Sequence, residues 1–202
     1  MDVRKRTIEE YTDLFAGKDP VPGGGGVSSV IGALAAAAGE MVCSLTAGKK
    51  KFESIEPEIN GIALRLNEAR NRMLTLSDKD AEAFEPLAAA YRDPDKTDVE
   101  MDSLYANAAQ VPLDVMRCVF TILDEIDYLA DNGSRLAVSD AACAAVYARA
   151  AISGEILNVR INTKCIKNSE IRNEINKEAD MLYDNGIKKC DLIFDKVMKG
   201  LE

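Results

Sequence analysis

Apolar residues recur every three or four positions along most of the chain, a spacing that predicts amphipathic helices. The predicted helices cover residues 7–15, 28–48, 54–91, 98–130, 139–157 and 168–198. Alternation with a period of two, which would indicate a strand, is scarce, and its least weak instance is 157–162. The sequence therefore predicts an all-α fold, a single-domain bundle of about six helices over residues 1–202.

Two of these segments are built mostly from Ala and Gly. The segment 28–48 is small on nearly every face, so neighbouring backbones can approach it closely, and we expect it to be the central helix. The segment 139–157 has a similar composition, and Ser139-Asp140 resembles an N-cap pair at its start. Thr7 with Glu10 has the form of a capping box. Pro112 should kink or divide the helix that contains it.

Composition and charge narrow the partners and the compartment. The chain of 202 residues has a net charge of -9, which opposes binding to nucleic acid or to anionic lipid. Glu40 near the middle of segment 28–48 argues against a membrane span. The five cysteines form no CxxC pair, which favours reduced thiols in a cytoplasm. The first 15 residues are charged and lack the apolar core of a signal peptide.

The absence of histidine restricts the possible chemistry. The chain contains no His at all, so no imidazole can act as a base or bind a metal. Any acid or base must be Asp, Glu, Lys, Tyr or Cys. Asp80 lies beside an apolar stripe, where burial would raise the pKa of its carboxyl group. Most such acids are simply exposed, and Asp140 can equally be explained as a helix cap.

Four consecutive glycines, Gly23, Gly24, Gly25 and Gly26, precede the small-residue helix. We expect a loop here that exposes backbone N–H groups at the positive end of the helix dipole, which suits an anionic or carbonyl-bearing ligand. Neither the P-loop nor the dinucleotide-binding spacing occurs, so nucleotide hydrolysis is not supported. The alternative is a tight entrance to a buried helix, with no ligand involved.

Other candidate groups are weak when taken singly. The run Lys49, Lys50 and Lys51 follows Gly48 and is most often a solvated helix end, although three ammonium groups could hold a poly-carboxylate ligand. Asn158 and Asn162 lie near the C-terminal end of the 139–157 helix, where Asn commonly satisfies backbone carbonyls.

Taken together, these motifs resemble one family along nearly the whole chain. The sequence from Pro22 through the glycines to Ser28, and the stretch from Leu45 to Phe52, are similar to the cyclodeaminase/cyclohydrolase family of folate one-carbon enzymes. The later matching segments follow in the same order: Asp78-x-Asp80-Ala-Glu-Ala-Phe84, Val111-Pro-Leu113, Asn132-Gly133, Ala137-Val-Ser-Asp140 and Gly154-x-x-Leu-Asn158-Val-x-Ile-Asn162.

The resemblance implies a homodimer that acts on the one-carbon bridge between N5 and N10 of tetrahydrofolate. Within it, Asp140 or Asp80 is the expected proton carrier and Lys49 an electrostatic partner. Substrate binding is expected from Gly23, Gly24, Gly25, Gly26, Ser28, Lys50, Lys51, Asn158 and Asn162, with the lysines meeting the carboxylates of a folate glutamyl or polyglutamyl tail. No metal and no cofactor beyond the folate substrate is implied.

Three functions stay open at this stage. A chain without a formiminotransferase half favours methenyltetrahydrofolate cyclohydrolase slightly over formiminotetrahydrofolate cyclodeaminase. The third alternative is a non-catalytic folate-binding or assembly module on the same scaffold. Its support is the departure from the family pattern after Gly133, where Ser134 stands in place of the usual Asn, and after Asn162.

Overall fold

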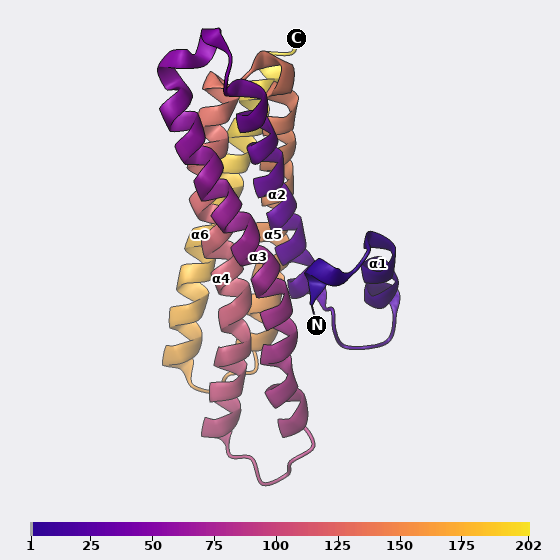
Figure 1. Cartoon of the computed structure of the whole chain (residues 1–202). Helices are drawn as coiled ribbons and strands as arrows, with labels where there is room; N and C mark the ends of the chain where they lie inside the picture. The colour runs from indigo at the N-terminus through magenta and orange to yellow at the C-terminus, as the bar shows by residue number, and fades with distance from the viewer. Residues whose placement is uncertain (1) are drawn as a thin grey trace.

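The computed structural model describes residues 2–202, and within that range the regular structure is helical, with no strand. Helices α2 to α6 run alongside one another in an elongated bundle, and α1 stands to one side near the start of α2 (Figure 1). The elements are η1 (Val3–Lys5), α1 (Ile8–Ala16), α2 (Gly24–Thr46), η2 (Lys50–Ile55), α3 (Glu56–Ala90), α4 (Asp98–Asn132), η3 (Arg135–Ala137), α5 (Val138–Thr163) and α6 (Ser169–Lys199). The predicted all-α bundle of six helices is confirmed.

The helix ends agree with the sequence in some places and differ in others. The capping box of Thr7 with Glu10 is present. The predicted loop over Gly24–Gly26 is wrong, because these residues already form the first turn of α2. The predicted cap of α5 is also wrong, since Ser139 and Asp140 lie inside its first turn and the N-cap is Ala137. The weak strand pattern over 157–162 is part of α5.

Pro112 does not divide α4, which runs without interruption over 35 residues. A proline inside a helix removes the N–H that would bind the carbonyl four residues earlier, here that of Ala108. The side-chain amide of Asn162 in α5 reaches this carbonyl, with 3.5 Å between its Nδ2 and the Ala108 oxygen. A contact from a neighbouring helix thus replaces the missing bond, which local sequence rules do not anticipate.

Small residues allow α2 to pack closely against the rest of the bundle. α2 contacts α3, α4 and α5, and α5 in turn contacts α4 and α6. A Cβ on Gly32 would lie 2.6 Å from Sδ of Met73, and one on Gly39 would lie 2.8 Å from Cδ1 of Leu66. Both distances are shorter than van der Waals contact, so a larger residue at either position would require the Met73 or Leu66 side chain to shift.

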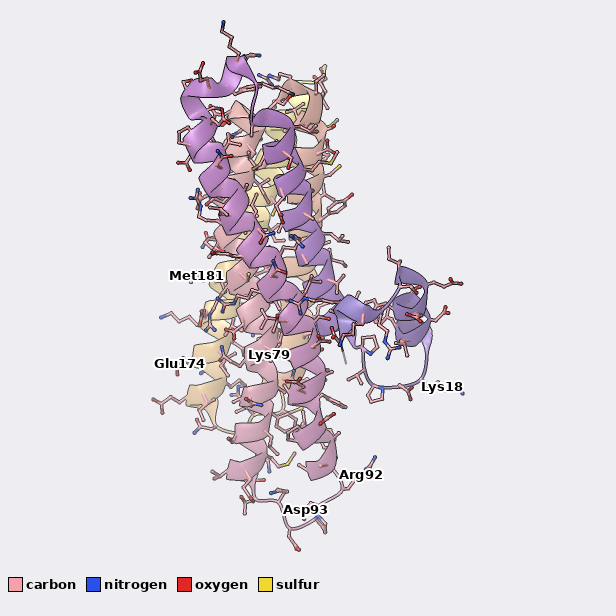
Figure 2. All side chains as sticks on the ribbon, viewed as in Figure 1. Lys18, Lys79, Arg92, Asp93, Glu174 and Met181 are labelled. Carbon is pink, nitrogen blue, oxygen red and sulfur yellow. The ribbon has the colours of Figure 1, made fainter. Side chains whose placement is uncertain are left out.

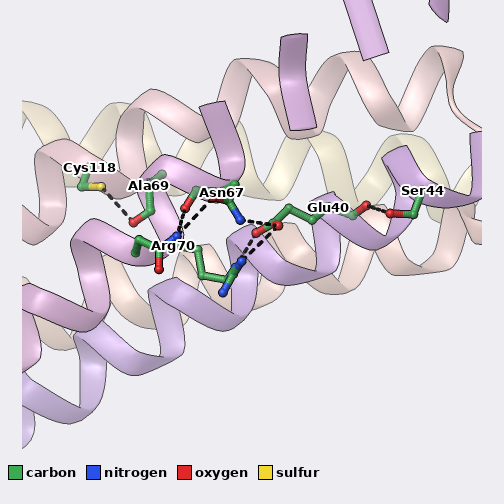
Figure 3. Close-up of polar contacts among 7 residues, drawn as sticks. Glu40, Ser44, Asn67, Ala69, Arg70 and Cys118 are labelled. Atoms are coloured by element: carbon green, nitrogen blue, oxygen red, sulfur yellow. Dashed lines mark hydrogen bonds and ion pairs between the residues drawn. The ribbon is translucent and has the colours of Figure 1, made fainter. Parts of the chain in front are cut away.

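A polar contact ties α2 to α3 (Figure 3). The guanidinium of Arg70 donates to Glu40, with 2.5 Å between Nε and Oε1, and the amide of Asn67 donates to the other oxygen of the same carboxylate. The charge that argued against a membrane span is therefore neutralised within the fold.

Two stretches are long and apolar enough to cross a membrane by length and composition alone. They are α2, with a mean hydropathy of 1.6, and Arg135–Thr163, with a mean hydropathy of 1.3. In the bundle, 56% of the first window and 44% of the second are buried against other helices. Much of their apolar character is thus used in packing within the chain.

We predict that Gly133→Ala destabilises the bundle. Gly133 ends α4, and a Cβ there would lie 2.6 Å from the backbone carbonyl oxygen of Leu129 and 2.8 Å from Cγ1 of Val42. Overpacking against a backbone atom should lower the free energy of unfolding by about 1–3 kcal/mol, read from the midpoint of a urea titration.

Gly61→Ala is the matched control for this variant. A Cβ on Gly61 meets only the end of the exposed Arg65 side chain, and alanine favours the helix interior, so stability should hold or rise by up to ~1 kcal/mol. Equal urea midpoints for the two variants would contradict the packing described for Gly133.

Candidate functional site

The first turn of α2 is capped by a side chain from another helix. Its own N-cap, Gly23, has no side chain to accept a hydrogen bond. Instead the N–H of Gly26 donates to Asp80 in α3, with 2.9 Å between N and Oδ2. The carboxylate thus satisfies one of the N–H groups that have no partner at a helix start, and its negative charge faces the positive end of the helix dipole.

This contact explains why residues without side chains are needed here. A Cβ on Gly25 would lie 2.6 Å from Oδ1 of Asp80 and 3.0 Å from its Cγ. Asp80 therefore occupies the volume that any other side chain would fill. The glycines serve the close approach of a carboxylate as well as the exposure of backbone N–H groups.

Helix α5 forms the opposite wall. The amide of Asn158 lies against Gly24, at 3.6 Å from the position of a Cβ there. Asn158 donates to the carbonyl of Gly154, and Asn162 donates to the carbonyl of Asn158 as well as to Ala108. Both asparagines satisfy carbonyls, as expected from sequence, and these bonds also fix their orientation beside α2.

Ser28 lies deeper, at the contact between α2 and α5. A Cβ on Gly154 would lie 2.1 Å from the hydroxyl oxygen of Ser28, so the two helices touch through this pair. Ser28 is buried and, unlike Gly23, Gly24 and Gly25, does not line the cleft. Its position is that of a packing residue beneath the site.

A cleft of about 420 Å³ opens where α2 begins, between the C-terminal parts of α3 and α5. Gly23, Gly24 and Gly25 line it, so N–H groups of the first turn of α2, which have no partner within the helix, lie at its edge. The lining residues are Pro20, Val21, Gly23, Gly24, Gly25, Asp80, Phe84, Leu87, Tyr91, Ala108, Asn158, Ile161, Asn162, Lys164 and Cys165.

Asp80 is the acidic group of this cleft. Burial raises the pKa of its carboxyl group above the usual 3.8, and the hydrogen bond from Gly26 offsets part of that rise. A carboxylate with a raised pKa is a better proton acceptor than an exposed one and can return the proton at a higher pH. The arrangement suits the transfer of a proton next to a ligand.

Asp78, two residues earlier in the same motif, has a structural task. It accepts a hydrogen bond from the N–H of Val3, at 3.0 Å, and thereby attaches the N-terminal segment to α3. Tyr11 of α1 extends the attachment, with its hydroxyl 3.4 Å from that of Ser77. The two aspartates of the motif therefore anchor two different segments.

The remaining predicted residues lie at the far end of α2, about 33 Å away at 1.5 Å per residue. Lys49 is exposed there, with its Nζ 3.4 Å from the Ser134 hydroxyl, and Asp140 begins α5 close by in the chain. Lys50 and Lys51 are exposed in η2. The structure thus brings Gly23–Gly26, Asp80, Asn158 and Asn162 together, and leaves Lys49, Lys50, Lys51 and Asp140 outside this cleft within one chain.

Sequence reasoning missed several groups at the site. Leu87 and Tyr91 lie on the apolar stripe that the helical period predicts, but the sequence did not assign them to the cleft that they line. Lys164 and Cys165 follow α5, and the early predicted end of that helix hid their position. Glu155 is buried within α5 and carries no motif that would have drawn attention to it.

The fold and the cleft define an all-α protein with one partly buried carboxylate at a helix start, and comparison with known proteins places it further. The family model for formiminotransferase-cyclodeaminase matches residues 7–181. A methenyltetrahydrofolate cyclohydrolase from Methylorubrum extorquens is 33% identical, over 95% of each chain. Formimidoyltransferase-cyclodeaminase from Gallus gallus is 27% identical over 93% of this chain, which spans 36% of that longer protein.

A solved structure agrees with these sequence matches. Formiminotetrahydrofolate cyclodeaminase from Thermotoga maritima superposes with a TM-score of 0.91 at 35% identity, over 98% of both chains. The chain therefore belongs to the formiminotransferase-cyclodeaminase family, which comprises folate cyclodeaminases and cyclohydrolases. The family resemblance drawn from the motifs is confirmed.

We predict that Gly25→Ala disrupts the contact between α2 and α3. The added Cβ would overlap Oδ1 of Asp80, so the carboxylate must move and the hydrogen bond from Gly26 should break. Because a hydrogen bond to a charged group contributes about 1.5–3 kcal/mol, stability should fall by a similar amount, and the amide proton of Gly26 should shift upfield in an NMR spectrum.

Gly23→Ala serves as the control in the same loop. A Cβ there would lie 3.5 Å from the carbonyl oxygen of Pro20, an ordinary contact. This variant should keep both the stability and the Gly26 amide shift. An unchanged Gly26 amide in Gly25→Ala would show that Asp80 does not depend on the missing side chain.

Proposed function

We propose that this protein is a methenyltetrahydrofolate cyclohydrolase that uses Asp80 to move protons. The observation that carries the proposal is the carboxyl group of Asp80, which lies at the cleft beside the α2 N-terminus with a raised pKa. The relative from Methylorubrum extorquens, which this chain matches over 95% of each length, supports cyclohydrolase in particular.

The chemistry requires a base and then an acid, and one carboxyl group can serve as both. Water attacks the cationic methenyl carbon, and Asp80 takes one of its protons. The bond from that carbon to N5 then breaks as Asp80 returns the proton to N5. The second proton of the water leaves to solvent as the carbonyl of the N10-formyl group forms. The N–H groups of Gly24 and Gly25, which line the cleft, would stabilise the oxygen of the tetrahedral intermediate.

Formiminotetrahydrofolate cyclodeaminase is the second candidate, favoured by the structural match to the Thermotoga maritima enzyme. In that reaction N10 attacks the formimino carbon and ammonia leaves, so a proton must again move at a tetrahedral carbon flanked by nitrogens. Asp80 fits this step equally well. The apolar residues Phe84 and Leu87 offer a surface for a flat ring in either case.

We further propose that the protein acts as a homodimer in the cytoplasm. Large apolar side chains stay exposed along α2 and α5, which pack against each other: Leu34 is 55% exposed and Met41 51% in α2, and Leu157 69% in α5. A second copy would bury them. For Lys49 and Asp140 to act at the cleft, they would have to come from that second copy, and the same holds for Lys50 and Lys51 as contacts of a glutamyl tail.

We predict that Asp80→Asn lowers the hydrolysis of methenyltetrahydrofolate by about 10²–10⁴-fold, since it removes the proton acceptor while preserving shape. In the wild type, kcat/KM should fall as the pH drops through the raised pKa of Asp80, above 3.8, because only the ionised carboxylate accepts the proton. The rate of the variant and the pH dependence of the wild type are both measured from the methenyl absorbance.

The same assay separates the alternatives. A rise in methenyl absorbance from formiminotetrahydrofolate would show cyclodeaminase activity, and a melting shift by folate without turnover would leave a binding module. Asp140→Asn tests the contribution of a second subunit. If the site is shared, mixing it with Asp80→Asn restores about a quarter of the activity through mixed dimers. Full activity of Asp140→Asn alone would restrict the proton step to Asp80.

We predict that Leu34→Glu dissociates the dimer. Light scattering should give twice 21.9 kDa for the wild type and a single chain for the variant, because a charge in a buried apolar interface cannot be solvated. Leu64→Glu, at a position 68% exposed on α3, is the control and should keep the mass of the wild type. A monomeric wild type would remove the homodimer proposal.

A further inference from the structure

Glu155 is a buried acid that the proposed reaction does not use. It lies in α5 with 0% exposure, and neither carboxyl oxygen has a hydrogen-bond partner among the protein groups of residues 2–202. It follows Gly154 and stands one turn before Asn158, the two α5 residues that touch the first turns of α2. Glu155 is thus beside the cleft, beneath its lining.

The charge of Asp80 acts on the carboxyl group of Glu155. Burial raises the pKa of Glu155 well above its usual value, and the charge of Asp80 raises it further. Asp80 differs in two respects, because it borders the cleft and accepts a hydrogen bond from Gly26. As the pH rises, the first proton to leave the pair therefore belongs to Asp80.

The elements around this pair supply no strong competing charge. From α2 the facing residues Gly24 to Ser29 carry no titratable group. From α1, the hydroxyl of Tyr11 lies 3.4 Å from that of Ser77, three residues before Asp80 in α3. Among the acids of α4 and α6, Asp102 accepts from the N–H groups of Lys167 and Asn168, and Asp114 and Glu178 are bound by Arg117. Lys164 lines the cleft.

We propose that Glu155 is a positioning residue that acts through Asp80: the two carboxyl groups share one negative charge, which Asp80 carries, while Glu155 keeps a proton. A single charge at the cleft matches the single positive charge of a methenyl bridge. Once Glu155 also ionises, repulsion between the two carboxylates weakens the placement of Asp80 against Gly26. Only the match to the methenyl bridge rests on the proposed function.

The amide of Gly26 provides a direct probe in the free protein, because it donates to Asp80. Its NMR shift, followed with the ¹³C signal of the Glu155 carboxyl, should show two steps with pH in the wild type. The first step reports Asp80 and the second, at higher pH, reports Glu155. Glu155→Gln should abolish the second step and keep the first, and Asp80→Asn should abolish the first.

Glu174→Gln is the matched control, an exposed glutamate on the outer side of α6 (Figure 2). It should leave both steps unchanged. An ionised Glu155 carboxyl at neutral pH, or a Gly26 profile that is the same in Glu155→Gln and the wild type, would overturn the proposal.

Stability gives a second readout that needs no ligand. Glu155 is protonated in the folded protein and ionised in the unfolded chain, so the wild type loses stability as pH rises from the unfolded pKa towards the folded one. Glu155→Gln escapes this loss, and its folding equilibrium constant should gain on the wild type by about tenfold per pH unit in that window. If the ratio of the two folding equilibrium constants does not change with pH, Glu155 does not keep its proton in the folded protein.

Activity then tests the functional step separately. In a cyclohydrolase, kcat/KM of the wild type should fall as the pH rises through the raised pKa of Glu155, and Glu155→Gln should remove that fall while keeping the acid limb. If the wild type converts neither folate, the proposed function fails, while the Gly26 titration still decides the carboxyl pair. A fall at high pH that persists in Glu155→Gln would overturn the positioning role.

Discussion

The hydrogen bond from Gly26 to Asp80 is the contact on which the site depends. It joins the start of one helix to the middle of another, and it requires that Gly25 have no side chain. Because the carboxylate caps α2, it is held in one place without a salt bridge that would lower its pKa strongly. A group fixed in this way can accept and return a proton without first reorganising.

The same requirement for small residues extends along α2. Gly32 and Gly39 let α2 lie against Met73 and Leu66 of α3, and Ser28 fits against Gly154 of α5. These contacts fix the axis of α2, and hence the direction in which its first turn faces the cleft. The bundle is close-packed above the cleft and open beyond the start of α2, so the end of one helix creates the cavity.

Much of the fold could be predicted from the sequence, because helical period and capping boxes are local signals. The start of α2 could not, since Gly24 to Gly26 are poor helix formers alone and are held by Asp80, 54 residues away. The predicted break at Pro112 was wrong because of another long-range bond. Pro112 leaves the carbonyl of Ala108 without its helical partner, and the side-chain amide of Asn162 donates to that carbonyl instead. Asp80 was found because it lies in a family motif beside an apolar stripe, whereas Glu155 lacks any such signal and its burial is visible only in three dimensions.

The proposed role of Asp80 is compatible with both reactions of the family. Both form a tetrahedral carbon between nitrogens and need one proton moved, so a carboxylate at the first turn of α2 would serve either one. They differ in the attacking group and the leaving group, water and N5 in one case, N10 and ammonia in the other. On the proposed mechanism, the choice would depend on residues that admit water or orient N10, and Tyr91, Lys164 and Cys165 line the cleft where such residues would lie.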